Sequence, residues 1–276
     1  MFTGRPLTVT REDATLHAWC HGAEGSPVVA FIHGGFMDRR MFDPQIGPLV
    51  EDGYAVLTWD LHGHGESSRR GTQRPSVADM AADLFTVLDE VDQSEPVILV
   101  GQSLGGMVVQ HAALTTPSRV SGLVTIGAPC INPADRKLRR RASLLWQVSG
   151  FITGLLPSSV VRAQLPKGTA ATPEAQRYVQ SVVQRVTKDD FRWLVHASRE
   201  AGRGLRGQRV AVPQLITLGE HDDSGAGRLT ALTASHWVSR DPSARYEVIP
   251  GAGHQAHQDQ PELFNRLLLD FLASIT

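Results

Sequence analysis

The sequence predicts an α/β fold, built on a doubly wound, mostly parallel sheet that carries a helical insertion. Short, continuously apolar runs at residues 27–32, 54–59 and 96–100 are typical of strands that are buried on both faces. Helical patterns separate these runs, and such an alternation of strands and helices indicates a parallel sheet. The alternation stops after residue 127, and no strand pattern returns before residue 210.

The elements at the N-terminus predict an edge of the sheet. Residues 7–10 and 14–20 alternate between apolar and polar side chains, and a charged turn at residues 11–13 separates them. This pattern predicts an antiparallel hairpin. The buried strand at residues 27–32 follows and leads into a glycine turn at residues 33–36.

The next elements alternate as a parallel sheet requires. A short helix is expected over residues 41–52, and the strand at 54–59 ends in a second glycine-rich turn at 60–67. A helix is predicted over residues 76–92, because seven apolar side chains share one helical face. These are Val77, Met80, Ala81, Leu84, Val87, Leu88 and Val91. The strand at 96–100, a helix at 107–114 and a strand at 120–127 complete this half.

The second half begins with the insertion, which shows helical patches broken by glycine and proline. Its strongest charge run, residues 136–141, is interpreted as a solvated helix face, with an anion-binding patch as the alternative. Strand character returns at residues 210–218 and 246–249, and a helix is expected over 261–275.

Composition excludes several classes of partner. Lys and Arg number 27 against 28 Asp and Glu, so the charge balance favours neither nucleic acid nor an anionic membrane. Cys20 and Cys130 fit no metal or redox spacing and are expected to be buried free thiols. Residues 1–6 show no signal-peptide pattern, and no apolar run reaches the length of a membrane span. A cytoplasmic protein with a small-molecule substrate is expected.

A serine between two glycines follows the buried strand at residues 96–100. The segment Gly101-Gln102-Ser103-Leu104-Gly105 fits the G-x-S-x-G pattern, in which a strand turns sharply into a helix and exposes the serine. The glycines let the strand and helix backbones come close. Ser103 is therefore the predicted nucleophile.

A serine hydroxyl needs a base to accept its proton, and an acid to orient that base. Asp222 and His254 follow the last two predicted strands, and the carboxyl ends of neighbouring parallel strands meet at one crevice. Asp223 is the alternative acid, and His257 is the alternative base. No H-E-x-x-H motif or clustered ligand spacing predicts a metal.

The chain order serine, aspartate, histidine and the surrounding motifs resemble the α/β-hydrolase superfamily, in its esterase, lactonase and perhydrolase-like branch. Residues 33–36 resemble the family's oxyanion turn. Residues 60–67 resemble its D-x-R-G-x-G-x-S turn, with His62 in place of the usual arginine. Residues 219–222, and Gly253-His254 with residues 258–261, resemble the acid and histidine segments. The insertion falls where this family carries a helical cap, which implies core segments at 1–130 and 209–276 and a cap at 131–208.

The predicted chemistry is hydrolysis of a carboxylic ester, lactone or thioester through an acyl-enzyme, without a cofactor. The backbone amides of Leu104 and of Gly35, with Phe36 as the alternative to Gly35, are the expected oxyanion donors. Carbon–carbon bond hydrolysis and perhydrolysis on the same triad remain alternatives, as does a receptor that binds a ligand without catalysis. Ser103 argues against the epoxide and haloalkane hydrolysis of relatives that use an aspartate. The oligomeric state is left open.

The most apolar part of the insertion, residues 144–156, bears on the substrate. If some of its side chains, Trp146 among them, line the pocket, the substrate is a small to medium, largely apolar ester or lactone. Core packing alone is the alternative interpretation.

Overall fold

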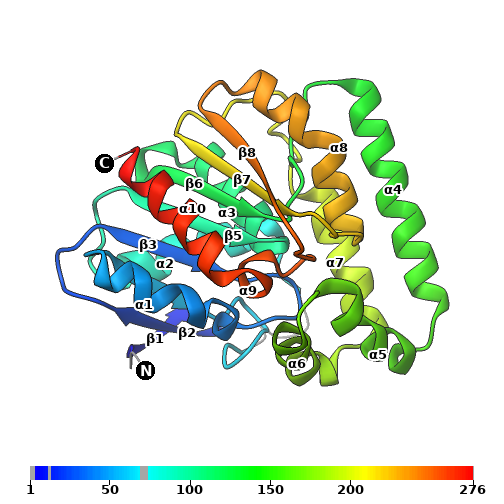
Figure 1. The fold of residues 1–276 in the computed structure, drawn as a ribbon, viewed down its shortest axis with the longest axis horizontal. Helices are drawn as coiled ribbons and strands as arrows, with labels where there is room; N and C mark the ends of the chain where they lie inside the picture. Colours follow the sequence, from blue (N-terminus) through cyan, green and yellow to red (C-terminus); the bar gives the residue numbers. More distant parts are fainter. Residues whose placement is uncertain (1–3, 12–13, 69–73, 276) are drawn as a thin grey trace.

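The computed structural model describes residues 4–11, 14–68 and 74–275, without the side chains of residues 148–155. Parts of the expected turn at 11–13 and of the N-terminal segment 1–6 lie outside the described residues. One sheet has the strand order β1-β2-β4-β3-β5-β6-β7-β8 (Figure 1). The strands are β1 (Arg5–Arg11), β2 (Ala14–His21), β3 (Val28–Ile32), β4 (Ala55–Trp59), β5 (Val97–Gln102), β6 (Val120–Ile126), β7 (Gln214–Gly219) and β8 (Ala244–Ile249). Pairing is antiparallel from β1 through β2 to β4 and parallel beyond β4, which confirms the predicted fold class and the N-terminal hairpin.

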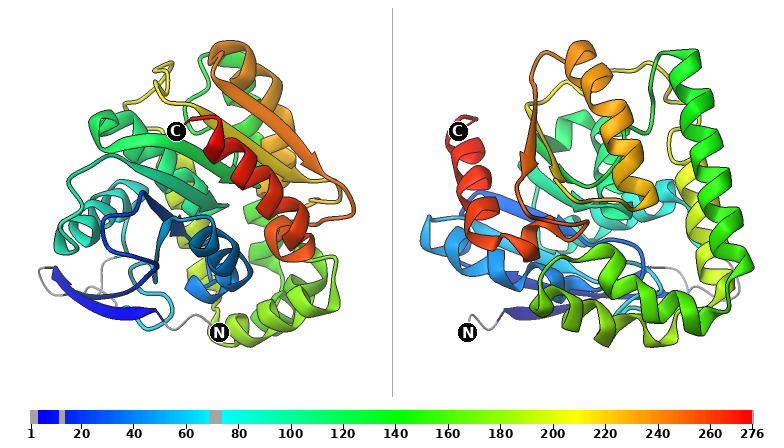
Figure 2. Two further views of the ribbon diagram at one scale, coloured as in Figure 1. Left: turned by 60° about the vertical axis from the view of Figure 1, so that its left-hand side comes forward. Right: turned by 45° about the vertical axis from the view of Figure 1, so that its right-hand side comes forward.

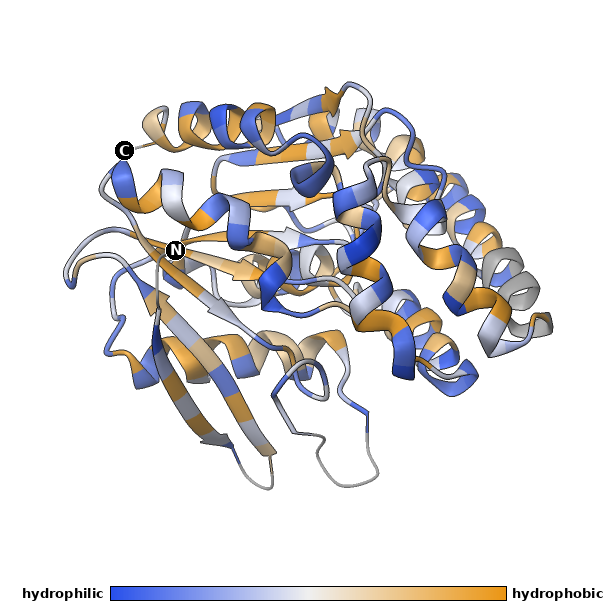
Figure 3. Ribbon diagram, turned by 60° about the horizontal axis from the view of Figure 1, so that its bottom comes forward, coloured by the Kyte–Doolittle hydropathy of each residue, from blue (hydrophilic) through white to orange (hydrophobic). Residues whose placement is uncertain are grey.

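Helices cover both faces of the sheet, and this explains why the central strands do not alternate. In β3, Ala30 and Ile32 are buried in one cluster, whereas Val29 and Phe31 are buried in the other. The first cluster lies under α2 (Val77–Glu90) and α3 (Leu104–Thr115). The second lies under α1 (Asp43–Glu51) and α10 (Pro261–Ala273). Figures 2 and 3 show the layers and the predominantly hydrophobic central strands.

The insertion between β6 and β7 consists of helices. They are α4 (Arg136–Leu155), α5 (Ser158–Thr169), α6 (Pro173–Val182) and α7 (Lys188–Glu200), with a short 3-10 turn at Val183–Arg185. Figure 1 shows them gathered on one side of the molecule, beyond the ends of the central strands.

The neck of the insertion is tied by Asn132. Its side-chain amide donates hydrogen bonds to the carbonyls of Leu205 (3.0 Å) and Gln208 (2.8 Å). The N–H of Gly207 donates to the Asn132 carbonyl at 3.2 Å. The outgoing and returning chains are therefore held together where they leave the core.

Some elements differ from the sequence-based expectations. Helix α8 (Gly225–Arg240) was not predicted, because its buried face includes the small or polar Thr230, Thr233 and Ala234 and gives a weak apolar period. Strand β7 begins at Gln214, after Pro213, and not at residue 210. Cys130 is a buried free thiol, but Cys20 is partly exposed.

Smaller elements complete the chain. They are 3-10 turns at Arg39–Phe42 and Pro117–Arg119 and the short α9 (Ala256–Asp259). Within the described ranges, no helix combines the length and the apolar character that crossing a bilayer requires.

Candidate active site

Ser103 lies at the sharp turn between β5, which ends at Gln102, and α3, which begins at Leu104. Its backbone has φ 51° and ψ −111°, outside the regions that serine ordinarily occupies. The turn is tight, since a Cβ on Gly101 would collide with the backbone of Gly105. This is the strained strand-to-helix geometry that the G-x-S-x-G pattern predicts.

His254 and Asp222 form a buried pair. Nδ1 of His254 lies 2.7 Å from Oδ2 of Asp222, and both residues are buried. A neutral imidazole that donates its Nδ1 proton to the carboxylate leaves Nε2 free to accept a proton. The other acid, Asp223, has an 86 % exposed side chain that lies 3.5 Å from Arg228.

His257, the alternative base, is fully buried in a different environment. Its ring lies 5.0 Å from that of Phe42 and 6.0 Å from that of Phe264. Neither ring nitrogen has a hydrogen-bond partner of normal geometry among the described residues. Burial and the nearby His254 lower the pKa of His257 to about 3, an effect that the Met41 backbone opposes. His257 is therefore neutral and packs as part of the core.

Ser224, which the sequence analysis did not single out, contacts both members of this pair. Its hydroxyl lies 3.2 Å from Nδ1 of His254, and its backbone N–H donates to Oδ1 of Asp222 at 3.1 Å. The hydroxyl also accepts from the N–H of Gly227 at the start of α8. The helix that was not predicted thus fixes the acid and the histidine.

The turn after β3 carries the expected second oxyanion donor. The N–H of Met37 donates to the Gly34 carbonyl (3.2 Å), and Phe36 at the third turn position has φ 70°. A positive φ at this position normally selects glycine. The ring of Phe36 packs edge-on against that of Phe191 in α7, with 4.7 Å between the ring centroids.

His33 anchors this turn as a neutral imidazole. Its Nδ1 donates to the Gly34 carbonyl (2.8 Å), while its Nε2 accepts from the N–H of Leu61 (2.9 Å). Complete burial lowers the pKa of His33 to about 4. The neutral tautomer that these two bonds require is therefore the stable form at neutral pH.

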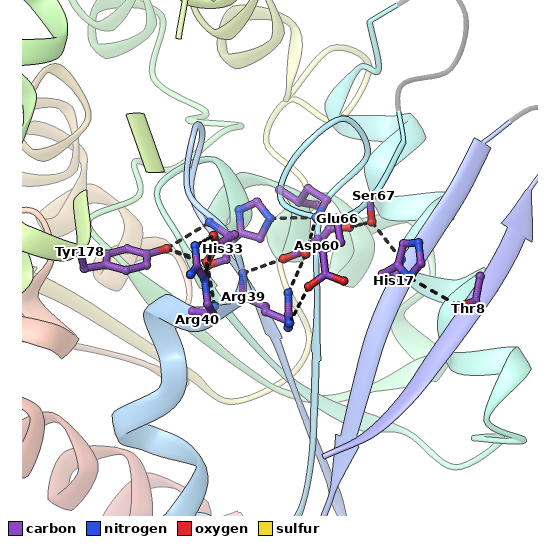
Figure 4. A network of polar contacts seen from close by, with 11 residues as sticks. Thr8, His17, His33, Arg39, Arg40, Asp60, Glu66, Ser67 and Tyr178 are labelled. Carbon is purple, nitrogen blue, oxygen red and sulfur yellow. Dashed lines mark hydrogen bonds and ion pairs between the residues drawn. The ribbon is translucent and has the colours of Figure 1, made fainter. Parts of the chain in front are cut away.

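An ion pair joins Arg39, in the 3-10 turn that follows residues 33–36, to the buried Asp60 of the second glycine-rich turn (Figure 4). The carboxylate of Asp60 accepts hydrogen bonds from the N–H groups of Arg39 (2.8 Å) and Glu66 (2.9 Å), and from the guanidinium of Arg39 (3.0 Å). On the other side, the hydroxyl of Tyr178 in α6 donates to the Asp38 carbonyl at 3.0 Å. These contacts fix the chain around the oxyanion turn from both the core and the insertion.

His62 occupies the position where the resemblance expects arginine. It is buried, and its Nδ1 lies 3.3 Å from Oδ2 of Asp83 in α2. The residue therefore takes part in holding the turn at residues 60–67 against α2.

A cavity of about 180 Å³ brings most of the predicted residues together. Ser103, His254 and Gly35 line it, Asp222 lies behind His254, and Leu104 is buried directly after the serine. The remaining wall is mostly apolar and comes largely from the insertion, including Trp146, Leu165, Phe191, Leu194 and Val195.

The described side chains of the apolar segment 144–156 differ in their position relative to this cavity. Trp146 lines it, whereas Leu144, Leu145 and Leu156 are exposed, at 61 %, 37 % and 41 %. The side chains of residues 148–155 lie outside the described part. Among the described residues, no group of three His, Cys, Asp or Glu side chains is arranged to hold a metal ion.

Comparisons with known proteins agree with this architecture. Residues 23–261 match the family model described as serine aminopeptidase, S33. A protein provisionally named carbamate hydrolase RutD, from Variovorax paradoxus strain S110, is 28 % identical over 95 % of this chain and 97 % of its own. A protein provisionally named 2-succinyl-6-hydroxy-2,4-cyclohexadiene-1-carboxylate synthase, from Bacillus subtilis strain 168, is 26 % identical over 98 % of this chain and 99 % of its own.

Among solved structures, a thermophilic esterase from Thermogutta terrifontis superposes with a TM-score of 0.77 at 19 % identity, covering 98 % of this chain and 99 % of that one. At this identity the similarity shows a shared fold.

Proposed function

The chain belongs to the serine aminopeptidase S33 family of the α/β-hydrolase superfamily, and from this premise we propose that it is a serine hydrolase. The proposed substrate is a carboxylic ester, lactone or thioester with a small to medium, largely apolar acyl group. The observation that carries the proposal is the pairing of His254 with Asp222 at 2.7 Å beside a cavity that Ser103 lines.

In the proposed reaction, Oγ of Ser103 attacks the substrate carbonyl carbon and its proton passes to Nε2 of His254. The charged imidazole is stabilised by the carboxylate of Asp222. The N–H groups of Leu104 and Gly35 are the proposed donors to the oxyanion. Leu104 suits this role because it is the first residue of α3, and its N–H has no partner within the helix.

The tetrahedral intermediate then collapses, and the leaving group departs with the proton from His254. A water molecule attacks the acyl-enzyme, His254 accepts a proton from it, and the carboxylic acid is released as Ser103 is restored. Apart from the substrate and this water, the groups that take part in the proposed cycle are side chains and amides of the chain itself.

Labelling with a fluorophosphonate tests the proposal directly. We expect one phosphonyl group per chain, attached to Ser103, and loss of both labelling and ester hydrolysis in Ser103→Ala. Unlabelled protein that still binds acyl esters would instead indicate a receptor. Labelled protein that turns over no ester, lactone or thioester would contradict the proposed substrate class.

A further inference from the structure

A second cavity, of about 640 Å³, lies beside the first and is lined by arginines. It is bounded by α4, by the end of α7 with the loop that follows it, and by the loop after β6. The six arginines are Arg136, Arg139, Arg140, Arg199, Arg203 and Arg206. Glu200 is the one acidic residue in the described lining.

Most of this positive charge has no acidic partner among the described residues. Arg203 pairs with Glu200 at 3.1 Å on the surface, and Arg139 donates to the Pro133 carbonyl at 2.9 Å. The other four arginines have no ion-pair or hydrogen-bond partner among the described residues. Like charges gathered around one cavity repel each other, and a bound anion would offset that repulsion.

The arginine cavity and the cavity at Ser103 share two lining residues, Trp146 and Ser198. Ser198 is only 8 % exposed. Its hydroxyl is buried and has no hydrogen-bond partner among the described residues. A buried hydroxyl without a partner is uncommon and is readily satisfied by a ligand. Met107, one turn beyond the nucleophile in α3, also lines the arginine cavity.

We infer that the arginine cavity binds a phosphorylated leaving group, while the acyl group occupies the smaller cavity at Ser103. This inference rests on the proposed function, because it specifies the substrate of that same site. Guanidinium groups bind phosphate oxygens through paired N–H donors.

The charge of the wall favours phosphates over carboxylates. Six arginines against one glutamate would match two or three phosphates, each of which carries about one to two negative charges. A carboxylate carries one, so a small ligand would need several carboxylates to reach the same charge. Three arginines of the charge run at residues 136–141 line this cavity, so the inference favours the anion-binding alternative for that run.

Binding can be measured without catalysis. Isothermal titration calorimetry of Ser103→Ala with adenosine 3′,5′-bisphosphate should show one binding site. Its affinity should fall as the NaCl concentration is raised, because salt screens the charges. When Arg140→Gln and Arg206→Gln are added to the Ser103→Ala protein, the bisphosphate should bind about tenfold more weakly or worse. Each hydrogen bond between a guanidinium and a phosphate contributes appreciably to the free energy of binding. A matched double variant, Arg177→Gln with Arg266→Gln, removes two exposed arginines that line neither cavity and should bind as before.

Kinetics on two thioesters then connect the cavity to the reaction. Butyryl-coenzyme A carries phosphates on its leaving group, whereas the butyryl thioester of N-acetylcysteamine does not. We expect kcat/KM for the first to fall by about tenfold in the Arg140→Gln, Arg206→Gln protein, with the second unchanged.

The outcomes separate the two proposals. Absence of bisphosphate binding, with ester hydrolysis intact, would overturn the inference and leave the proposed function standing. Bisphosphate binding that depends on the arginines, with no hydrolysis of any ester or thioester, would overturn the proposed function instead. Equal affinity for citrate and the bisphosphate would overturn the assignment to phosphate.

Discussion

The side-chain amide of Gln102 donates a 3.1 Å hydrogen bond to the backbone carbonyl of His254. Gln102 directly precedes the proposed nucleophile, so this bond connects the serine turn to the histidine loop. A Cβ on Gly34 would collide with Oε1 of Gln102, so the expected oxyanion turn packs directly against the same side chain. The buried Gln102 therefore contacts both the loop at His254 and the turn at residues 33–36, and it precedes Ser103 directly.

We predict that Gln102→Leu will lower kcat by about ten- to a hundredfold with little change in KM, because small displacements of reacting groups are costly. The control is Gln110→Leu, which removes another buried glutamine, one that bonds to Gly106 and Pro129. Steady-state kinetics and urea unfolding of both variants make the comparison. Equal losses of kcat in the two variants would mean that Gln102 acts only through stability.

The two adjacent acids should differ sharply in effect. Asp222→Asn is expected to lower kcat by about 10⁴, since an amide in this place favours the wrong tautomer of His254. Asp223→Asn should change kcat by less than about threefold, because its side chain is 86 % exposed and lies beside Arg228. Both are measured at saturating ester. A larger loss for Asp223→Asn would reassign the acid.

Trp146 should set the preference for acyl length. Each methylene buried in the apolar cavity contributes about 0.8 kcal/mol, or about fourfold in kcat/KM. On p-nitrophenyl esters, kcat/KM should therefore rise from acetate to butyrate, and Trp146→Ala should flatten the rise. Leu144→Ala is the control, because Leu144 is 61 % exposed, and this variant should keep the rise of kcat/KM from acetate to butyrate. A steep rise that persists in Trp146→Ala would exclude Trp146 from acyl binding.

The free energy of unfolding should fall in mild acid, because two histidines are buried in their neutral form. Folding lowers the pKa of His33 to about 4 and of His257 to about 3, whereas the unfolded chain takes up these protons near pH 6.5. Protonation therefore favours the unfolded state, and the stabilisation present above pH 6.5 is lost as the pH falls toward the folded-state values. The free energy of unfolding should decrease by about 1.4 kcal/mol per pH unit for each histidine in this window.

Urea unfolding at pH 7, 6 and 5 measures this slope. His257→Leu should make the slope shallower and leave stability at pH 7 equal or higher, because it removes a buried ring whose nitrogens have no hydrogen-bond partner of normal geometry among the described residues. An unchanged slope in this variant would assign the acid sensitivity to other groups.

The parts of the site that could be predicted from the sequence are those with a local signal. Ser103 and Asp222 follow the buried strands β5 and β7, His254 follows the more exposed edge strand β8, and parallel strands bring such positions to one edge of the sheet. The strained φ of Ser103 is likewise a property of its own turn. These features needed no knowledge of distant packing.

The other contacts depend on tertiary structure and have no local signal. Gln102 and Ser224 are ordinary polar residues in the sequence, and they gain a role only because the loop at His254 passes beside them. Helix α8 was missed because small and hydroxylated side chains replace an apolar stripe. The arginines after α7 approach those of α4 only when the insertion folds.

The paired strands on either side of the insertion have a consequence for engineering the protein. Strands β6 and β7 are hydrogen-bonded neighbours, with Leu123 opposite Gln214, and Asn132 ties the neck just beyond them. The sheet is thus continuous without the helices that leave it and return. Exchanging the insertion for another helical segment should therefore change the pocket walls while the proposed reacting groups stay on the core.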